Sequence, residues 1–437
     1  MRRFRAIAAV LAAASLASVA NAVPEQGEPV WVEMAPEGGS TVRLLTAAAQ
    51  CPPLVVDSRS VAMRERAAPS KLPVRSNKAG NSEATVFPGR ICELALPRTA
   101  RLAKLNAQAL PLPRARINRI VLIGDTGCRL KAADNAWQSC NDPAQWPFAR
   151  VAARAAALHP DLVLHVGDYH YRENACPDNQ PGCSGSIWGY GEAAWRADFL
   201  EPAAPLLGAA PWVVVRGNHE ECARAGQGWW RLLDPHPLFG GRDCLDPAND
   251  TSGNRTEPYT IDLGLGVQLI VADLAGLANA KQMDSATMAL YRNDFAQLGA
   301  LTKGARTSFV TAHYPFNAVL WGKQGGVSVG SGPTAAFAPL ALAGVRAMIA
   351  GHVHALQFAR IAAQPTQVVA GFSGTMEDEA PAPASLAEAR GKPGADRISA
   401  LTTVAGRFGF ALIERSRLDW RVTAYGLDGS VLCRFAL

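Results

Sequence analysis

The sequence lacks the features by which several large classes of protein are recognised. Among its 437 residues no block of five or more like charges occurs, and removing Arg2, Arg3 and Arg5 leaves 40 basic against 37 acidic residues, a formal charge of +3. A nucleic-acid-binding surface is therefore not indicated. No stretch after residue 22 carries eighteen uninterrupted apolar residues, so we expect no membrane span in the mature chain. Internal repeats are also absent, and the oligomeric state has no signature in the sequence.

The nine cysteines include no CxxC pair, which leaves zinc-ribbon and thioredoxin-like sites without support. Pairing nearest neighbours along the chain predicts four disulfides and leaves Cys433 over. The four pairs are Cys51–Cys92, Cys128–Cys140, Cys176–Cys183 and Cys222–Cys244. This choice closes the shortest loops, although spacing alone does not fix the connectivity.

The first 22 residues have the organisation of a secretory signal. A positive start is followed by an apolar run of about fifteen residues, at 6–20, and by the small-x-small sequence Ala20-Asn21-Ala22. Such a run is short for a bilayer span, so a membrane anchor is the less favoured alternative. We expect cleavage after Ala22 and a periplasmic or secreted protein, in compartments where disulfides form.

The remaining chain divides into a small region and a larger one. Hydrophobic residues make up 49% of the chain and charged residues 18%, which is typical of a protein with a sizeable core. Residues 23–115 contain short β-like runs, as at 30–32 and 54–56, broken by Gly, Pro and Ser, and we expect a β-rich N-terminal region that ends in a linker at 97–113. The main domain is expected over residues 116–437.

In the main domain, short apolar runs alternate with helix-compatible segments, which indicates an α/β fold. A helix is expected at 148–158 and a surface loop at 376–397. Five runs are expected to be buried strands: residues 120–123, 162–166, 212–215, 308–311 and 345–350.

A polar cluster follows each of these five strands. The clusters are Gly124-Asp125-Thr126-Gly127, Gly167-Asp168-Tyr169-His170-Tyr171, Gly217-Asn218-His219-Glu220, Val310-Thr311-Ala312-His313 and Gly351-His352-Val353-His354. Ligands of open α/β sheets bind at the carboxyl ends of the strands, so the five clusters are expected to meet. Asp, Tyr and Asn offer oxygen and His offers nitrogen, which together suit a pair of metal ions roughly 3.5–4 Å apart. Each cluster alone is unremarkable, but all five in order indicate a binuclear metal site.

The five clusters resemble the pattern GDxG, GDxxY, GNH(D/E), VxxH, GHxH of the purple acid phosphatases, within the calcineurin-like superfamily. The resemblance extends over residues 117–360 and does not include residues 23–115. Most superfamily members open with DxH, whereas Gly127 stands two residues after Asp125, and Tyr171 offers a replacement ligand. A phenolate is a hard donor suited to trivalent iron; the alternative is a tyrosine that only packs. The resemblance implies a four-layer α-β-β-α sandwich.

The resemblance also implies a role for each residue of the clusters. The first metal, Fe(III), would be bound by Asp125, Asp168, Tyr171 and His354. The second, a divalent Fe, Zn or Mn ion, would be bound by Asp168, Asn218, His313 and His352, with Asp168 bridging. His219 would contact the phosphate or the leaving group, with Asn218 also near the substrate. His170 would either line the cleft or merely pack.

The implied function is hydrolysis of small phosphate esters, foremost monoesters, by a metal-activated hydroxide with His219 as proton donor. A phosphodiesterase on the same centre is the first alternative. A non-catalytic metal- or phosphate-binding protein is the second, and His219 beside a full ligand set argues against it.

Of the residues outside the motifs, His159 is expected at the surface and His165 in the core. For Asp273 a structural role is favoured over support of the site. Arg129, Arg172 and Arg216 neighbour ligands, and salt bridges are favoured over contact with phosphate.

Overall fold

The computed structural model describes residues 27–75, 84–277, 284–322, 325–330, 344–378, 381–417 and 419–437. The expected signal at 1–22 and its cleavage point lie outside these residues. Within them, no helix is both long enough and apolar enough to cross a membrane.

A ten-stranded mixed sheet forms the first half of the fold. In spatial order its strands are β27 (Val431–Ala436), β26 (Asp419–Gly426), β25 (Gly409–Ser416), β11 (Arg119–Ile123), β14 (Leu162–His165), β15 (Trp212–Val214), β1 (Val30–Met34), β2 (Ser40–Thr46), β8 (Arg90–Leu96) and β5 (Arg64–Ala67). The central strands β11, β14, β15 and β1 run parallel, and their neighbours on both sides are antiparallel.

A seven-stranded sheet faces it. Its order is β16 (Tyr259–Gly264), β17 (Val267–Val271), β18 (Thr307–Thr311), β21 (Val345–Ala350), β23 (Thr366–Ala370), β22 (Leu356–Ile361) and β24 (Ile398–Val404). Buried aliphatic and aromatic side chains fill the space between the sheets, among them Leu122 and Leu164 from the first and Leu269 and Phe309 from the second. Their burial supplies the largest favourable contribution to the packing of the two sheets.

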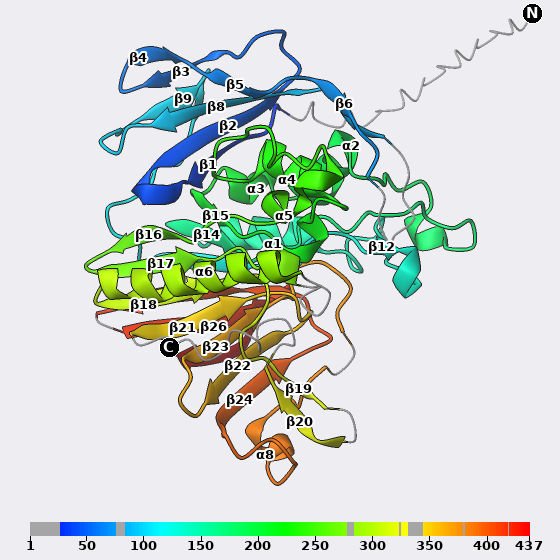
Figure 1. Cartoon of the computed structure of the whole chain (residues 1–437), viewed down its shortest axis with the longest axis vertical. Helices are drawn as coiled ribbons and strands as arrows, with labels where there is room; N and C mark the ends of the chain where they lie inside the picture. The colour runs from blue at the N-terminus through cyan, green and yellow to red at the C-terminus, as the bar shows by residue number, and fades with distance from the viewer. Residues whose placement is uncertain are drawn as a thin grey trace, which may run out of the picture.

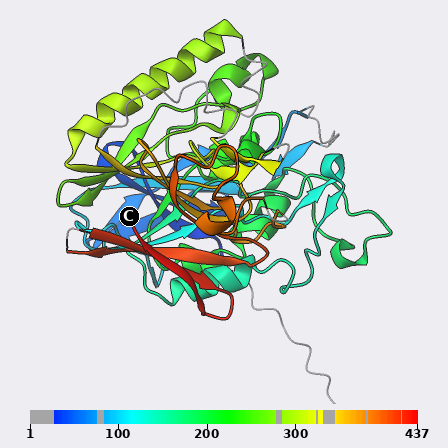
Figure 2. The same ribbon diagram turned by 90° about the horizontal axis from the view of Figure 1, so that it is seen from below.

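Helices cover the outer face of each sheet. The long helix α6 (Ser285–Leu301) packs Tyr291, Phe295 and Leu298 on the second sheet and runs along one side of the molecule (Figure 2). The first sheet is covered by α1 (Phe148–Ala156), α2 (Glu192–Trp195), α3 (Ala204–Leu207) and α4 (Gly226–Leu232). The expected α-β-β-α sandwich is therefore confirmed, as are the helix near 148–158 and all five strands.

The β-rich N-terminal region is present, but most of it continues the first sheet and does not form a sheet of its own. Strand β1 pairs in parallel with β15, and β2, β8 and β5 extend the same sheet (Figure 1). A separate four-stranded sheet packs beside them, with β10 (Gln108–Ala109), β9 (Ala103–Leu105), β3 (Pro53–Val56) and β4 (Arg59–Ala62). A hairpin of β6 (Ser70–Leu72) and β7 (Thr85–Phe87) completes the region.

Two expected irregular segments carry structure. The linker expected at 97–113 contains β9 and β10, because β9 finds a partner in β3 some fifty residues earlier, which local sequence does not reveal. The loop expected at 376–397 contains α8 (Leu386–Ala389), whose first turn is capped by Ser385. Residues 379–380 of that loop lie outside the described structure.

All four expected disulfides are confirmed, and Cys433 is the free cysteine. Cys128–Cys140 and Cys176–Cys183 lie in one small apolar cluster beside the hairpin of β12 (Leu130–Lys131) and β13 (Ala136–Trp137). Both flank the loops that follow β11 and β14, so they brace the segments that carry two of the five clusters.

Candidate metal centre

The five clusters meet at one edge of the two facing sheets. Those after β11, β14 and β15 come from the first sheet, and those after β18 and β21 from the second. The backbone N–H of His352 donates to both carboxylate oxygens of Asp125, at 3.2 and 3.1 Å, although 227 residues separate them. The expected convergence is therefore present.

One group of side chains surrounds the hydroxyl of Tyr171. Its oxygen lies 2.6 Å from Asp168 Oδ2, 2.9 Å from His354 Nε2 and 3.2 Å from Asp125 Oδ1. All four side chains are buried. Three oxygen donors and one imidazole nitrogen thus share one small volume, which suits a hard cation.

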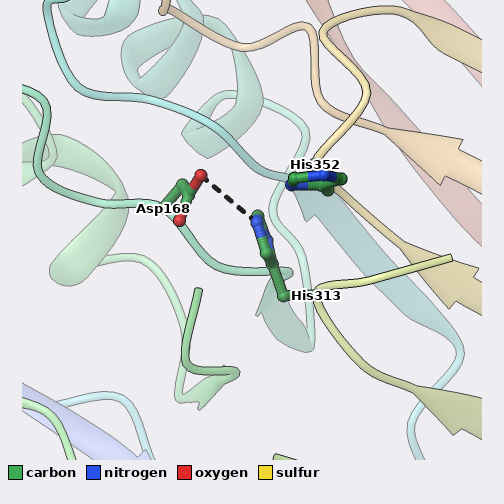
Figure 3. A group of neighbouring side chains, drawn as sticks. All are labelled: Asp168, His313 and His352. Atoms are coloured by element: carbon green, nitrogen blue, oxygen red, sulfur yellow. Dashed lines mark ion pairs between the residues drawn. The ribbon is translucent and has the colours of Figure 1, made fainter. Parts of the chain in front are cut away.

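A second group surrounds the amide oxygen of Asn218. This oxygen lies 3.1 Å from His313 Nε2 and 3.1 Å from His352 Nδ1, while His313 Nε2 lies 3.2 Å from Asp168 Oδ2. Figure 3 shows Asp168 and His313 turned toward each other with the ring of His352 beside them. Asn218 and His352 are partly exposed, so this group faces the solvent.

Asp168 belongs to both groups, because its Oδ2 contacts Tyr171 and His313. In each of the sets Asp168-His313-His352 and Asp125-Asp168-His354, one ligand atom per residue lies within 4.8 Å of the others. Two buried carboxylates side by side repel each other unless a cation lies between them. The donors present therefore fit a pair of metal ions, and the residues of these two groups are the ones that could hold them.

The backbone that carries these ligands is tightly constrained. Asp125, Asp168 and His352 have φ values of 54°, 59° and 71°, a left-handed conformation that non-glycine residues adopt at some cost and that is frequent at functional sites. A Cβ atom on Gly217 would lie 2.0 Å from Asp168 Oδ1, and one on Gly351 would lie 2.5 Å from Asp125 Oδ2. Only glycine fits at these two positions, which explains their place in the motifs.

The carboxylate of Glu220 holds two of the ligand loops together. It accepts backbone N–H groups of Asp168 at 3.1 Å, Tyr169 at 2.9 Å, His170 at 3.1 Å and Gly217 at 3.0 Å. Four donors converge on one fully buried carboxylate and fix the left-handed turn at Asp168. The sequence places Glu220 in a motif, but its supporting role was not expected.

Asp198 performs a similar task for Tyr171. Its carboxylate accepts the backbone N–H groups of Tyr171 at 2.7 Å and Cys128 at 2.8 Å, and it binds the Arg172 guanidinium at 2.7 Å. Asp198 lies in a helical segment 27 residues after Tyr171, where no motif marks it. Sequence reasoning missed this residue for that reason.

The ring of His219 is held by Glu173 and Arg224, neither of which was expected at the site. Its Nδ1 lies 2.9 Å from Glu173 Oε1 and also contacts Arg224, and its Nε2 lies 4.0 Å from Asp168 Oδ2. Donation from Nδ1 to Glu173 leaves Nε2 directed at the centre. Burial and Arg224 lower the pKa of His219 to about 4.

Glu173 should make stability depend on pH. Burial raises the pKa of Glu173, but Arg224 and His219 outweigh that effect and lower it from 4.5 to about 2. The charged form therefore stabilises the fold above pH 4.5 by about 3 kcal/mol, and this contribution disappears as the pH falls through 2. We expect the unfolding free energies of metal-free wild type and Glu173→Gln to converge between pH 4.5 and 2. A difference that stays constant over this range would contradict the assignment.

Hydrogen bonds on the far side of two imidazoles direct their other nitrogen to the centre. Nδ1 of His313 donates to the Val166 carbonyl at 2.8 Å, and Nδ1 of His354 donates to the Met376 carbonyl at 2.9 Å. Such contacts select the tautomer and orientation of metal-binding histidines. Burial lowers the pKa of His313, but Asp168 outweighs it and raises the pKa to about 9, so a cation would displace a proton.

The phenol of Tyr171 ionises only with difficulty in the absence of a cation. Burial and the carboxylates of Asp168 and Asp125 raise its pKa well above 10. A bound cation reverses this effect, because it favours the negatively charged form of a ligand.

His170 does not reach the centre. Its ring is fully buried, with centroid distances of 5.5 Å to Tyr190 and 5.6 Å to Trp195. The substrate-binding role considered for His170 is therefore replaced by packing, because its side chain points into the aromatic core beneath the loop.

The remaining expectations outside the motifs are met. His159 is exposed, whereas His165 is buried and stacks on Tyr169 at 3.8 Å. Ion pairs join Arg216 to Asp273 at 3.2 Å. Arg129 pairs with Asp134 and Arg172 pairs with Asp198, both at 2.7 Å.

Comparison with known proteins agrees with this fold. No curated protein sequence matches significantly. The fold is similar to a purple acid phosphatase from yellow lupin (Lupinus luteus) seeds, with a TM-score of 0.58, 14% identity and coverage of 93% of this chain and 73% of that one. It is also similar to PhoD, with a TM-score of 0.52, 12% identity and coverage of 93% and 88%. The sequence model for calcineurin-like phosphoesterases matches residues 118–356, more than half of the chain. The chain therefore belongs to the calcineurin-like phosphoesterases, metal-dependent hydrolases of phosphate esters with a dinuclear site.

Proposed function

We propose that the protein is a secreted phosphomonoesterase of the purple acid phosphatase type. The observation that carries this proposal is the Tyr171 hydroxyl, which lies within 3.2 Å of donor atoms of Asp125, Asp168 and His354. A phenol in that position is a hard ligand that favours trivalent iron. Gly127 occupies the position where a DxH motif would supply a histidine.

The two groups of side chains define the proposed ligand sets. Fe(III) is assigned to the group around Tyr171, and a divalent Fe, Zn or Mn ion to the group around Asn218, with Asp168 common to both. Two cations so placed would neutralise phosphate oxygens and lower the pKa of water. The partly exposed Asn218 and His352 mark the side from which the ester enters.

The protein residues orient the ester and supply a proton. Asn218 belongs to the solvent-facing group, and the buried ring of His219 lies 3.8 Å from that of Tyr171 beside it, so the two residues can contact the phosphate from neighbouring positions. Nε2 of His219, directed at the centre by Glu173, can donate a proton to the departing oxygen. With the pKa of His219 near 4, donation is favoured in acid solution.

Secretion is supported by the cysteine usage. Four disulfides are typical of proteins that fold outside the cytoplasm. We assign residues 1–22 to a signal, residues 23–115 to the N-terminal region and residues 116–437 to the catalytic part. The last two share one sheet and are expected to fold together.

Monoester and diester preference can be separated with one pair of substrates. We expect kcat/KM for p-nitrophenyl phosphate to exceed that for bis(p-nitrophenyl) phosphate, because two cations held by these groups would stabilise the more highly charged monoester more strongly. The reverse order would favour a phosphodiesterase on the same centre. Inactivity on both, with metals bound, would favour a binding protein.

His219→Gln should slow hydrolysis more strongly for esters whose leaving group is more basic. An alkoxide requires a proton as it departs, whereas p-nitrophenolate does not. We expect kcat for glycerol phosphate to fall roughly 10²-fold or more, and kcat for p-nitrophenyl phosphate by about tenfold at most. Equal losses on the two substrates would contradict the role of His219 as proton donor.

A further inference from the structure

Two arginines of the N-terminal region bind the carbonyl end of α4. The last carbonyl groups of a helix have no partners within the helix, and cations near them are favourable. Arg66 of β5 donates to the carbonyls of Trp230 at 2.5 Å, Asp234 at 3.1 Å and His236 at 2.9 Å. It also donates to the carbonyl of Arg231 at 3.1 Å.

Arg43 of β2 completes this arrangement. It donates to the Leu232 carbonyl at 2.7 Å and also to that of Asp234. Both arginine side chains are only 1% exposed, and each lies beside a buried carboxyl group. Glu33 lies 3.0 Å from Arg43, and Glu93 lies 3.1 Å from Arg66. The last turn of α4 and the chain that follows are therefore fixed by strands more than 160 residues earlier.

The other end of α4 is bonded to the turn that carries His219. Ala225 N donates to the His219 carbonyl at 3.1 Å, and Gly226 N donates to the Glu221 carbonyl at 2.9 Å. Arg224, just before the helix, donates to the Asn218 carbonyl at 2.9 Å. A shift of α4 would thus move Arg224 and the His219 turn with it.

We propose that Arg43 and Arg66 are positioning residues for catalysis, which hold His219 in place through α4. The N-terminal region then contributes to the active site by positioning a catalytic residue, and it is not an accessory domain. This inference rests on the proposed function in one respect, because its test uses the proton transfer assigned to His219.

The test measures kcat of the full-length Arg66→Lys protein on two esters with different leaving groups, p-nitrophenyl phosphate and glycerol phosphate. Lysine keeps the charge opposite Glu93, but its three donors spread from a single nitrogen and cannot reach four carbonyls as the planar guanidinium does. We expect the ratio of kcat on p-nitrophenyl phosphate to kcat on glycerol phosphate to rise about tenfold, since small displacements of a catalytic group are costly. Partial unfolding would lower both rates equally and leave the ratio unchanged.

Arg64→Met is the matched control. Arg64 also lies on β5 and pairs with Glu93 at 2.7 Å, but its side chain is 69% exposed. For Arg64→Met, the ratio of kcat on p-nitrophenyl phosphate to kcat on glycerol phosphate should equal that of wild type. The positioning role is refuted by one combination of results. Folded Arg66→Lys would keep the wild-type ratio of the two kcat values, while His219→Gln raises it. If His219→Gln itself leaves the ratio unchanged, the proton-donor assignment fails instead. Should Arg66→Lys not fold, Arg43→Lys is read in the same way.

Discussion

Asp168→Asn is expected to remove metal binding and activity together, with kcat reduced on the order of 10³-fold or more. Oδ2 of Asp168 lies 2.6 Å from the Tyr171 hydroxyl and 3.2 Å from His313 Nε2, so both groups of ligands share it. Asparagine preserves the shape of the side chain but loses the negative charge, and its amide nitrogen cannot coordinate a cation. Elemental analysis of the purified variant, together with kcat on p-nitrophenyl phosphate, measures both effects.

Asp273→Asn is a control for this substitution. Asp273 is another buried carboxylate just after a strand, but it pairs with Arg216 at 3.2 Å and contacts none of the seven ligands assigned to the centre. This variant should retain the wild-type metal content. An Asp168→Asn protein that keeps two ions per chain and a near wild-type rate would rule out the shared ligand.

Glu220→Ala is expected to give the largest loss of stability. The carboxylate accepts four backbone N–H groups, from Asp168, Tyr169, His170 and Gly217. Alanine leaves these donors buried without that partner, and each donor left unsatisfied costs at least about 1 kcal/mol. We expect the unfolding free energy to fall by at least about 4 kcal/mol, with loss of metal binding as the turn at Asp168 relaxes.

The measurement is best made on metal-free protein, so that loss of stability is not a consequence of lost metal. Glu220→Gln serves as the comparison, because its remaining oxygen can still accept some of the N–H groups, and its loss should be smaller. Metal-free Glu220→Ala with an unfolding free energy within about 1 kcal/mol of wild type would contradict the structural role.

The parts of the site that follow strands could be predicted from sequence. Each ligand cluster begins where the apolar run of a strand ends, so the change from apolar to polar residues marks the position of the cluster in the sequence. The glycines beside the ligands could be predicted too, because the backbone approaches a carboxylate at Gly217 and Gly351. Nearest-neighbour pairing was sufficient for the four disulfides, since each closes a loop of at most 41 residues.

The supporting carboxylates could not be predicted in the same way. Glu173, Asp198 and Glu220 act by accepting backbone N–H groups or orienting a ring across distances of up to 70 residues in sequence. A buried acid has no local pattern that separates it from an exposed one. The same limit applies to β1, which joins β15 across about 180 residues and so merges the N-terminal region with the main sheet.

The proposed iron site is tested most directly by the metal content and visible spectrum of wild-type protein beside Tyr171→Phe. The substitution keeps the ring and removes only the oxygen that lies 2.9 Å from His354 Nε2 and 2.6 Å from Asp168 Oδ2. With a ferric phenolate, wild type should contain one iron and one divalent ion and show a broad charge-transfer band with a pink to purple colour. Tyr171→Phe should lose that band while Asp125, Asp168 and His354 still bind a weaker ion. Colourless, iron-free wild type that is fully active with two divalent ions would contradict the assignment of iron to this centre.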